Sequence, residues 1–286
     1  MTCKPFGDVM QQNIIRLYDE SQAVFKLQHV LNFYLKNELM CYKPTGIFDE
    51  HTESRVRKFQ TQAGLVVDGV AGPITIKALR IDMTPELLSD DDYAAAAVEL
   101  GVTAAHIRAV AEVETRARPF WEWQSNCTPI LYERHIFDRN ITKVAQAGKS
   151  SADLLMLRDK LRKIEPDICN PIAGGYGKES QQYPKLERAV TYSETVALGA
   201  CSWGTFQIMG YHAELMGYHS VQAFVRSQQA SQIDHLKAFV RYIKANPNLL
   251  SALRKKDWLS FARGYNGPAQ NGYDKRMAEA FAKWNR

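Results

Sequence analysis

The sequence has few cysteines and no motif of a metal-dependent or nucleophilic hydrolase. Five cysteines are scattered over 286 residues, and no pair has the C-x-x-C spacing of a zinc or redox site. An odd, scattered set argues against a disulfide framework, so we expect ordinary reduced thiols. The seven histidines show neither H-x-H nor H-E-x-x-H spacing, and no G-x-S-x-G turn is present. We therefore expect no metal and no cofactor.

Long apolar runs are missing as well. No segment approaches the ~18 consecutive apolar residues of a membrane span. The start, MTCKPFGDVM, lacks the apolar core of a secretion signal, so we expect a protein made in the cytosol. Hydrophobic residues make up 45% and charged residues 23% of the chain, which is typical of a globular protein.

The net charge of +5 is unevenly distributed along the chain. Residues 1–83 carry 10 basic and 9 acidic side chains, whereas residues 237–286 carry 11 basic and 3 acidic ones. A total excess this small does not require a nucleic acid partner, and we expect none. The final segment, YDKRMAEAFAKWNR, has apolar residues on one helical face. Either this helix lies on an anionic outer-membrane surface, or it is the last helix packed on its domain.

The first eighty residues contain a short internal repeat. TGIFDEHTESRV at 45–56 and DGVAGPITIKAL at 68–79 both read as a turn glycine, a threonine six residues later, and a helix. Gly46 and Gly69 supply the turn backbone. Apolar residues with helical spacing lie before and between the two copies: Val24, Leu27, Leu31, Leu35, Val56 and Phe59. The pattern predicts a small helical unit built from two similar halves.

This region resembles the peptidoglycan-binding domain 1 family. The family pattern LQ, DGxFGxxT, FQ, GLxxDGxxGxxT is matched over about residues 22–80. Two positions depart from it: Thr45 replaces the usual Asp before the first glycine, and Asp49 stands where Gly is common. These departures imply a weaker first half-site. The resemblance implies a three-helix domain whose partner is bacterial peptidoglycan.

A domain boundary is expected near residues 80–88, because Thr84-Pro85-Glu86 reads as a helix start. We therefore divide the chain into a binding domain at 1–83 and a second domain at 88–286. Sustained strand-like alternation is absent, and the Gly-rich stretch at 170–180 reads as a loop. The expected helices of the second domain are 92–115, 151–165, 186–198, 204–216, 220–246, 256–263 and 272–284. The predicted fold class is all-α.

Two acids in TAAHIRAVAEVETRARPF occupy different helical faces. Glu114 continues the apolar face that begins at Ile107, whereas Glu112 falls nearly opposite. A carboxyl group in apolar surroundings has a raised pKa, because desolvation penalises its charged form. Such a group donates a proton to a leaving oxygen near neutral pH. The alternative is a helix-end acid paired with one of the nearby arginines: Arg116, Arg118 or Arg134.

Three elements resemble the lysozyme-like superfamily: IRAVAEVET, SWGTFQIM and ARGYNG. More closely, AEVET, ILYERHIFDR, CSWGTFQIMGYHAELMGY and FARGYNGP are similar to the N-acetylmuramidase family found in bacteriophage endolysins, over roughly residues 88–286. The resemblance implies hydrolysis of the bond between N-acetylmuramic acid and N-acetylglucosamine, with lysis of the host cell. It makes Glu114 the proton donor.

The resemblance also implies a set of groove-lining residues. Gln207 would direct its amide to the substrate and to the backbone near Glu114, and Gly204 would let chain and sugar approach closely. The alternative for Gln207 is an amide that is bonded internally at a tight turn. The other expected substrate-binding residues are Tyr132, Trp203, Tyr265 and Asn266.

Glu133, in LYERH, has two open interpretations. It is either the second carboxylate of a glycoside hydrolase, acting on water or stabilising charge, or a structural acid held by Arg134. A lytic transglycosylase would need no second carboxylate, since the C6 hydroxyl of muramic acid attacks in place of water. A non-catalytic wall-binding or virion component would need neither acid.

Two further expectations concern the surroundings of the site and of the protein. The aromatic run at 120–123 either stacks on sugar rings or belongs to the core. The endolysin resemblance implies a monomer that accumulates in the host cytoplasm until a membrane pore releases it to act on the wall in the periplasm.

Overall fold

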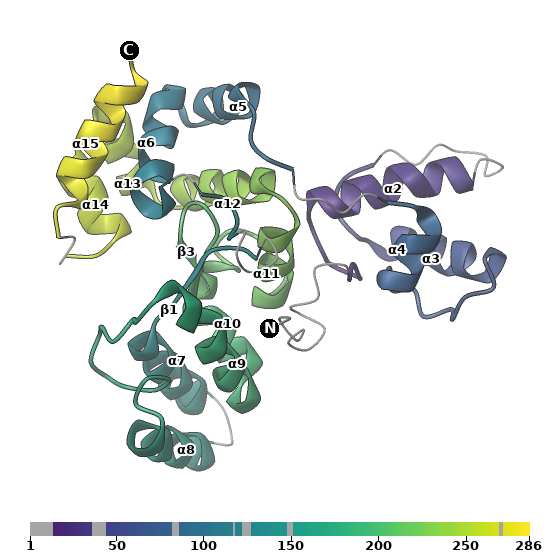
Figure 1. Ribbon diagram of the computed structural model, residues 1–286, viewed down its shortest axis with the longest axis horizontal. Helices are drawn as coiled ribbons and strands as arrows, with labels where there is room; N and C mark the ends of the chain where they lie inside the picture. The colour runs from purple at the N-terminus through teal and green to yellow at the C-terminus, as the bar shows by residue number, and fades with distance from the viewer. Residues whose placement is uncertain are drawn as a thin grey trace.

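The computed structural model describes the chain in seven stretches: 14–35, 44–81, 86–116, 118–121, 127–147, 151–268 and 271–286. They form a small helical domain, which contains α2 to α4, and a larger domain that contains all later elements (Figure 1). Two separate clusters of buried apolar side chains form the cores of these two parts. The mainly helical fold class predicted from the sequence is confirmed.

The small domain consists of three described helices: α2 (Gln22–Tyr34), α3 (Glu50–Gln62) and α4 (Pro73–Leu79). Each helix begins directly after a residue that caps it or at a proline. The side chains of Ser21 and Asp49 accept hydrogen bonds from the first turns of α2 and α3, and α4 begins at a proline. Asp49, which departs from the family pattern, is therefore an N-cap.

The two copies of the internal repeat share one set of hydrogen bonds, made by a buried glutamine in each copy. The amide oxygen of Gln28 accepts from Gly46 N at 2.9 Å, and that of Gln60 accepts from Gly69 N at 3.0 Å. Each amide nitrogen donates to the threonine hydroxyl in the helix that follows the turn, at 2.9 and 3.1 Å. Each buried glutamine thus binds a turn to a helix start, because its amide offers both acceptor and donors.

The larger domain begins with α5 (Asp90–Leu100) and α6 (Ala104–Thr115). The expected single helix over 92–115 is wrong, because Gly101 takes the left-handed conformation at φ 66° and ends α5. No single described helix has the length and hydropathy needed to cross a membrane, and α5 and α6 meet that test only as a pair bent by 110°.

A small antiparallel sheet connects the two halves of the domain. It contains β1 (Ile130–Tyr132), β2 (Cys201–Trp203) and β3 (Ile208–Met209), with Ile130 opposite Trp203 and Trp203 opposite Ile208. The helix expected over 204–216 is wrong. The chain turns back at Gly204 and Gln207, which both have positive φ, and pairs as a hairpin.

The remaining helices follow in two runs along the chain. Between β1 and β2 come α7 (Arg134–Ala147), α8 (Ser151–Ile164), η2 (Glu179–Gln181), α9 (Gln182–Tyr192) and α10 (Glu194–Gly199). After β3 come η3 (Gly210–His212), α11 (Val221–Ala230), α12 (Gln232–Lys244), α13 (Pro247–Lys255), α14 (Trp258–Tyr265) and α15 (Tyr273–Trp284). The expected helix over 220–246 is interrupted at Ser231, which caps α12.

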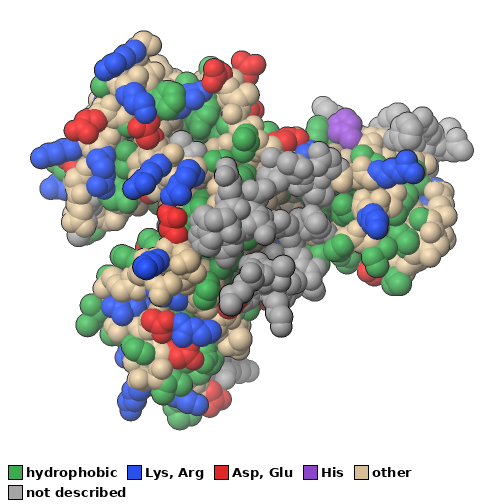
Figure 2. Space-filling model, viewed as in Figure 1, with side chains coloured by type: hydrophobic (Ala, Val, Ile, Leu, Met, Phe, Trp, Pro, Cys, Tyr) green, Lys and Arg blue, Asp and Glu red, His purple; other side chains and the backbone are tan. Residues whose placement is uncertain are grey.

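The C-terminal helix α15 packs against α6 (Figure 1). Its Met277 is fully buried, and the side chains of Lys283 and Trp284 both donate to Glu112 of α6. Met277 and Ala280 of the apolar face of α15 are therefore buried in the protein, as the alternative of a last helix packed on its domain predicts. Figure 2 shows that Lys and Arg side chains gather on the surface of this lobe.

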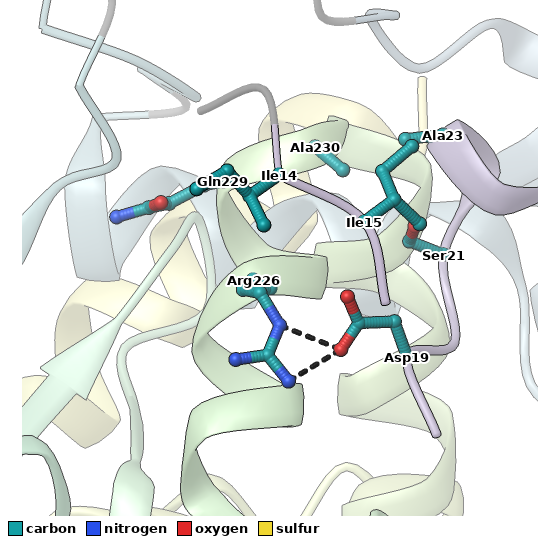
Figure 3. A pocket seen from close by; sticks show the side chains of 8 residues that line it. All are labelled: Ile14, Ile15, Asp19, Ser21, Ala23, Arg226, Gln229 and Ala230. Atoms are coloured by element: carbon teal, nitrogen blue, oxygen red, sulfur yellow. Dashed lines mark hydrogen bonds and ion pairs between the residues drawn. The ribbon is translucent and has the colours of Figure 1, made fainter. Parts of the chain in front are cut away.

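The two domains meet where Asp19 and Glu20, just before α2, bond to Arg226 of α11 and Arg241 of α12. Asp19 and Arg226 form an ion pair with Nη2 to Oδ1 at 2.5 Å, with side chains only 4% and 10% exposed (Figure 3). Burial raises the pKa of Asp19, and the charge of Arg226 opposes this shift. The carboxylate of Asp234 at the start of α12 accepts from Gln22 N at 2.9 Å. The contact between the domains is thus polar and specific.

Replacing Arg226 by alanine should destabilise the protein by about 3 kcal/mol or more, because it leaves the Asp19 carboxylate buried without its partner. Thermal and urea unfolding measure the loss. Lys244→Ala is the matched control, since its pair with Glu99 is exposed and should contribute at most about 1 kcal/mol. Equal effects of the two variants would contradict the importance of the buried pair.

Candidate active site

Glu114 lies in the last turn of α6, on the face that the sequence predicts. Its predecessors on that face, Ile107, Val110 and Ala111, are fully buried. Glu112 points to the other side, where it binds α15. The alternative pairing of Glu114 with Arg116, Arg118 or Arg134 has no counterpart among the contacts of the described residues.

The carboxyl group of Glu114 accepts a hydrogen bond from Asn266 Nδ2 at 2.8 Å. Burial raises its pKa to about 7, while the bond from Asn266 and the charge of Arg276 oppose the shift. Desolvation thus outweighs both stabilising contacts. A carboxyl group with this pKa is partly protonated at neutral pH and able to donate.

Asn266 reaches Glu114 because it ends α14, and Tyr265 fixes that end. The Tyr265 hydroxyl donates to Phe206 O at 2.6 Å, and its ring stacks on Phe261 with centroids 5.3 Å apart. The phenol thus bonds a backbone carbonyl and not the carboxyl group of Glu114. The two residues therefore have different partners: Tyr265 bonds to the turn after β2, and Asn266 bonds to the carboxyl group of Glu114.

The same turn is tied to α6. Thr115, the residue after Glu114, donates through its hydroxyl to Thr205 O at 3.1 Å. The end of α6 and the end of α14 are therefore both anchored on residues 204–207. This turn sets the separation between Glu114 and Asn266.

Gln207 is bonded within the protein. Its amide oxygen accepts from Ser202 Oγ at 2.8 Å, and its amide nitrogen donates to Gly204 O at 2.9 Å and Pro129 O at 3.2 Å. These contacts correspond to the internally bonded alternative, and they hold Gln207 at its positive φ of 48°. Contact between this amide and the substrate stays a prediction.

Three other residues that were expected to contact the substrate are buried in the protein. Trp203 is fully buried and donates to Leu198 O, and Tyr132 is 1% exposed and donates to Ile168 O. Gly204 is buried as well, and a Cβ there would lie 2.9 Å from His235. We assign these residues to the core, because side chains without exposed surface cannot touch a saccharide.

Glu133 lies between β1 and α7. Its carboxylate oxygen Oε2 accepts from the Tyr176 hydroxyl at 3.3 Å and lies 3.3 Å from His135 Nδ1. Arg134 turns away and donates to two backbone carbonyls, so the interpretation of Glu133 as an acid held by Arg134 is wrong. Burial raises the pKa of Glu133, and the Tyr176 bond and the charge of Arg139 oppose the shift.

Tyr273, the first residue of α15, lies within electrostatic range of both acids. Burial raises its pKa, and the charges of Glu114 and of Glu133 both add to that shift. Both carboxyl groups therefore act on one phenol. The sequence did not single out Tyr273 or Tyr176 because they are distant from the acids along the chain, although Tyr176 stands in the conspicuous Gly-rich loop.

Two remaining expectations concern aromatic and metal-binding residues. Phe120 and Trp121 are 8% and 5% exposed and belong to the core, whereas Glu122 and Trp123 lie outside the described residues. Within the described stretches, no group of three His, Cys, Asp or Glu side chains is arranged to hold a metal ion. Cys201, which begins β2, is fully buried.

The domain thus holds two desolvated acids, Glu114 and Glu133, and a pair of carboxyl groups is what glycoside hydrolysis usually uses. Residues 103–285 match the N-acetylmuramidase family, and residues 20–79 match the putative peptidoglycan binding domain. The chain belongs to the N-acetylmuramidase family and carries a peptidoglycan-binding domain.

The chain is also similar to the crystal structure of Burkholderia AP3 phage endolysin, with 37% identity and a TM-score of 0.59. The match covers 96% of this chain and 98% of that chain. No curated protein matches. The chain is thus an N-acetylmuramidase of the phage endolysin type, which hydrolyses peptidoglycan.

The raised pKa of Glu114 makes a prediction about stability. The folded pKa of about 7 exceeds the ordinary 4.5, so the stabilisation is fully present below pH 4.5 and is lost as the pH rises through 7. At pH 8 the charged carboxylate should cost up to about 3 kcal/mol, which Glu114→Gln removes. The variant should therefore melt at a higher temperature than wild type at pH 8 but not at pH 4. Glu112→Gln is the control, and an equal gain at both pH values would contradict the raised pKa.

Asn266→Ala should move the alkaline limb of the activity profile to higher pH. The Asn266 hydrogen bond lowers the pKa of Glu114, so its removal lets burial raise that pKa further. Profiles of kcat/KM against pH on purified peptidoglycan measure the limb. An alkaline limb at the wild-type pH would show that this limb does not reflect the ionisation of Glu114.

Proposed function

We propose that Glu114 donates the proton to the glycosidic oxygen between N-acetylmuramic acid and N-acetylglucosamine. The observation that carries the proposal is the desolvated Glu114 carboxyl, with a pKa of about 7 and Asn266 as its hydrogen-bond partner. A proton donor works best when its pKa is near the working pH, and raised carboxyl pKa values are typical of glycosidase acids.

Glu133 is the second carboxylate of this mechanism and activates or orients the water that completes hydrolysis. Burial and a tyrosine hydroxyl surround it, and Arg134 does not neutralise it. Burial raises the pKa of both acids, and at Glu133 the Tyr176 bond and the charge of Arg139 oppose that shift and favour the ionised form. A protonated Glu114 together with an ionised Glu133 is the combination that the acid and base roles require. A transglycosylase would leave Glu133 without a role.

The binding domain keeps the catalytic domain on its polymer. Peptidoglycan is the ligand of the small domain. Linking two binding modules raises the local concentration of one site near the other. The polar contact between Asp19 and Arg226 supports a fixed orientation of the two domains on the wall.

The setting in the cell belongs to the same proposal. The endolysin type supports accumulation in the host cytoplasm, release through a membrane pore and action as a monomer on the wall in the periplasm. Contact with an anionic outer-membrane surface would rest on charge alone, through exposed residues such as Lys275 and Arg276, because the apolar face of α15 packs on α6.

Mass spectrometry of the fragments released from purified peptidoglycan tests the reaction. Wild type should release fragments with reducing N-acetylmuramic ends. Glu114→Gln should reduce their release by at least about a hundredfold, because general acid catalysis typically contributes 10²–10⁴ in rate. Glu133→Gln should also cause a large loss.

The same spectra separate the rival reactions. Anhydro ends, which are lighter by one water, would make the protein a transglycosylase and remove Glu133 from the mechanism. If Glu114→Gln releases fragments as fast as wild type, Glu114 is not the proton donor. Glu112→Gln, two residues away on the opposite face, is the control for helix α6.

A further inference from the structure

The Gly-rich loop at 170–180 delivers a tyrosine to the site. Tyr176 donates its hydroxyl to Glu133 Oε2 at 3.3 Å and is 37% exposed. Three glycines around it, Gly174, Gly175 and Gly177, have positive φ between 69° and 93°. The loop can take this path because glycine carries no Cβ to forbid it.

A buried lysine holds the loop from beneath. Lys185 of α9 is 5% exposed, and its ammonium group donates to Gly175 O at 2.8 Å and Tyr176 O at 2.7 Å. Burial lowers its pKa, and the charge of Asp167 opposes this shift. A buried ammonium group is costly unless its donors are used. Here it uses them on the backbone of the residue that contacts Glu133.

A buried glutamine connects the loop to the strand that carries Glu133. The amide nitrogen of Gln182 donates to Tyr176 O at 2.7 Å, and its amide oxygen accepts from Tyr132 N at 2.9 Å. Tyr132 directly precedes Glu133 in the chain. One side chain, itself 1% exposed, therefore fixes both members of the Tyr176–Glu133 pair.

We propose that Tyr176 is a positioning residue for Glu133, and that Lys185 and Gln182 hold the loop so that its hydroxyl reaches the carboxylate. This inference rests on the proposed role of Glu133. The bond stabilises the ionised carboxylate and restricts its rotation, so that one oxygen accepts from Tyr176 and the other is left for water. No residue outside this loop donates a hydrogen bond to the Glu133 carboxylate among the described contacts.

The inference predicts a change in pH dependence. The other titratable or charged groups that act on Glu133, or on which it acts, are His135 and Arg139 of α7, Cys201 of β2 and Tyr273 of α15. None of them is altered when Tyr176 loses its hydroxyl. Since the Tyr176 bond lowers the pKa of Glu133, its loss raises that pKa and moves the acidic limb of kcat/KM to higher pH.

The test is Tyr176→Phe in the full chain, assayed on purified peptidoglycan across pH. We expect kcat to fall about tenfold with KM nearly unchanged, and the acidic limb to move to higher pH. Tyr211→Phe is the matched control, because Tyr211 is a tyrosine of similar exposure, 42%, whose hydroxyl makes no bond to Glu133. Wild-type kcat and an unmoved acidic limb in Tyr176→Phe would overturn the inference.

A double variant tests the anchor. Lys185→Met should lower kcat in the same direction as Tyr176→Phe, and the combination should be little worse than either change alone, because both act through one contact. Fully additive losses would contradict this coupling. Thermal melting checks that each variant is folded.

Glu133→Gln separates this inference from the proposed function. If Glu133→Gln keeps wild-type activity, the base role fails and the positioning role fails with it. If Glu133→Gln loses activity while Tyr176→Phe behaves like Tyr211→Phe, only the role of Tyr176 is overturned.

Discussion

The desolvation of one carboxyl group is the constraint on which the rest of the site depends. Glu114 ends a helix whose other residues on that face are fully buried, and burial outweighs the opposing contacts from Asn266 and Arg276. The result is an acid that keeps its proton near neutral pH. Burying this carboxyl group costs folded stability as the pH rises from 4.5 through 7, so the surrounding packing has to maintain the site.

The turn at 204–207 is the part of the packing that maintains it. It receives the hydroxyl of Tyr265 from α14 and that of Thr115 from α6, and so fixes the ends of the two helices that carry Asn266 and Glu114. Its own backbone is held by the Gln207 amide. SWGTFQIM is thus a structural centre of the site, and contact of its Gln207 amide with the sugar stays a prediction. The hydroxyls and amides buried there satisfy one another, which is the condition for placing them inside a core.

Much of the fold could be predicted from local pattern, and much of the site could not. Helical periodicity separated Glu114 from Glu112, and the glycine and threonine spacing revealed the repeat in the small domain, because both signals lie within a few residues. The hairpin of β2 and β3 was missed because its strands have only 3 and 2 residues, and a short apolar stretch reads equally well as a helix. Tyr176 reaches Glu133 only through tertiary folding, which no local pattern encodes.

The most direct test of this account is a titration of Glu114 itself. Carboxyl carbon NMR of protein labelled with ¹³C-glutamate, with the signal assigned by its absence in Glu114→Gln, reports the protonation of this group without relying on activity. The account predicts a midpoint near pH 7. A midpoint near the ordinary value of 4.5 would mean that Glu114 is ionised at neutral pH, and the proton for the leaving oxygen would have to come from another group.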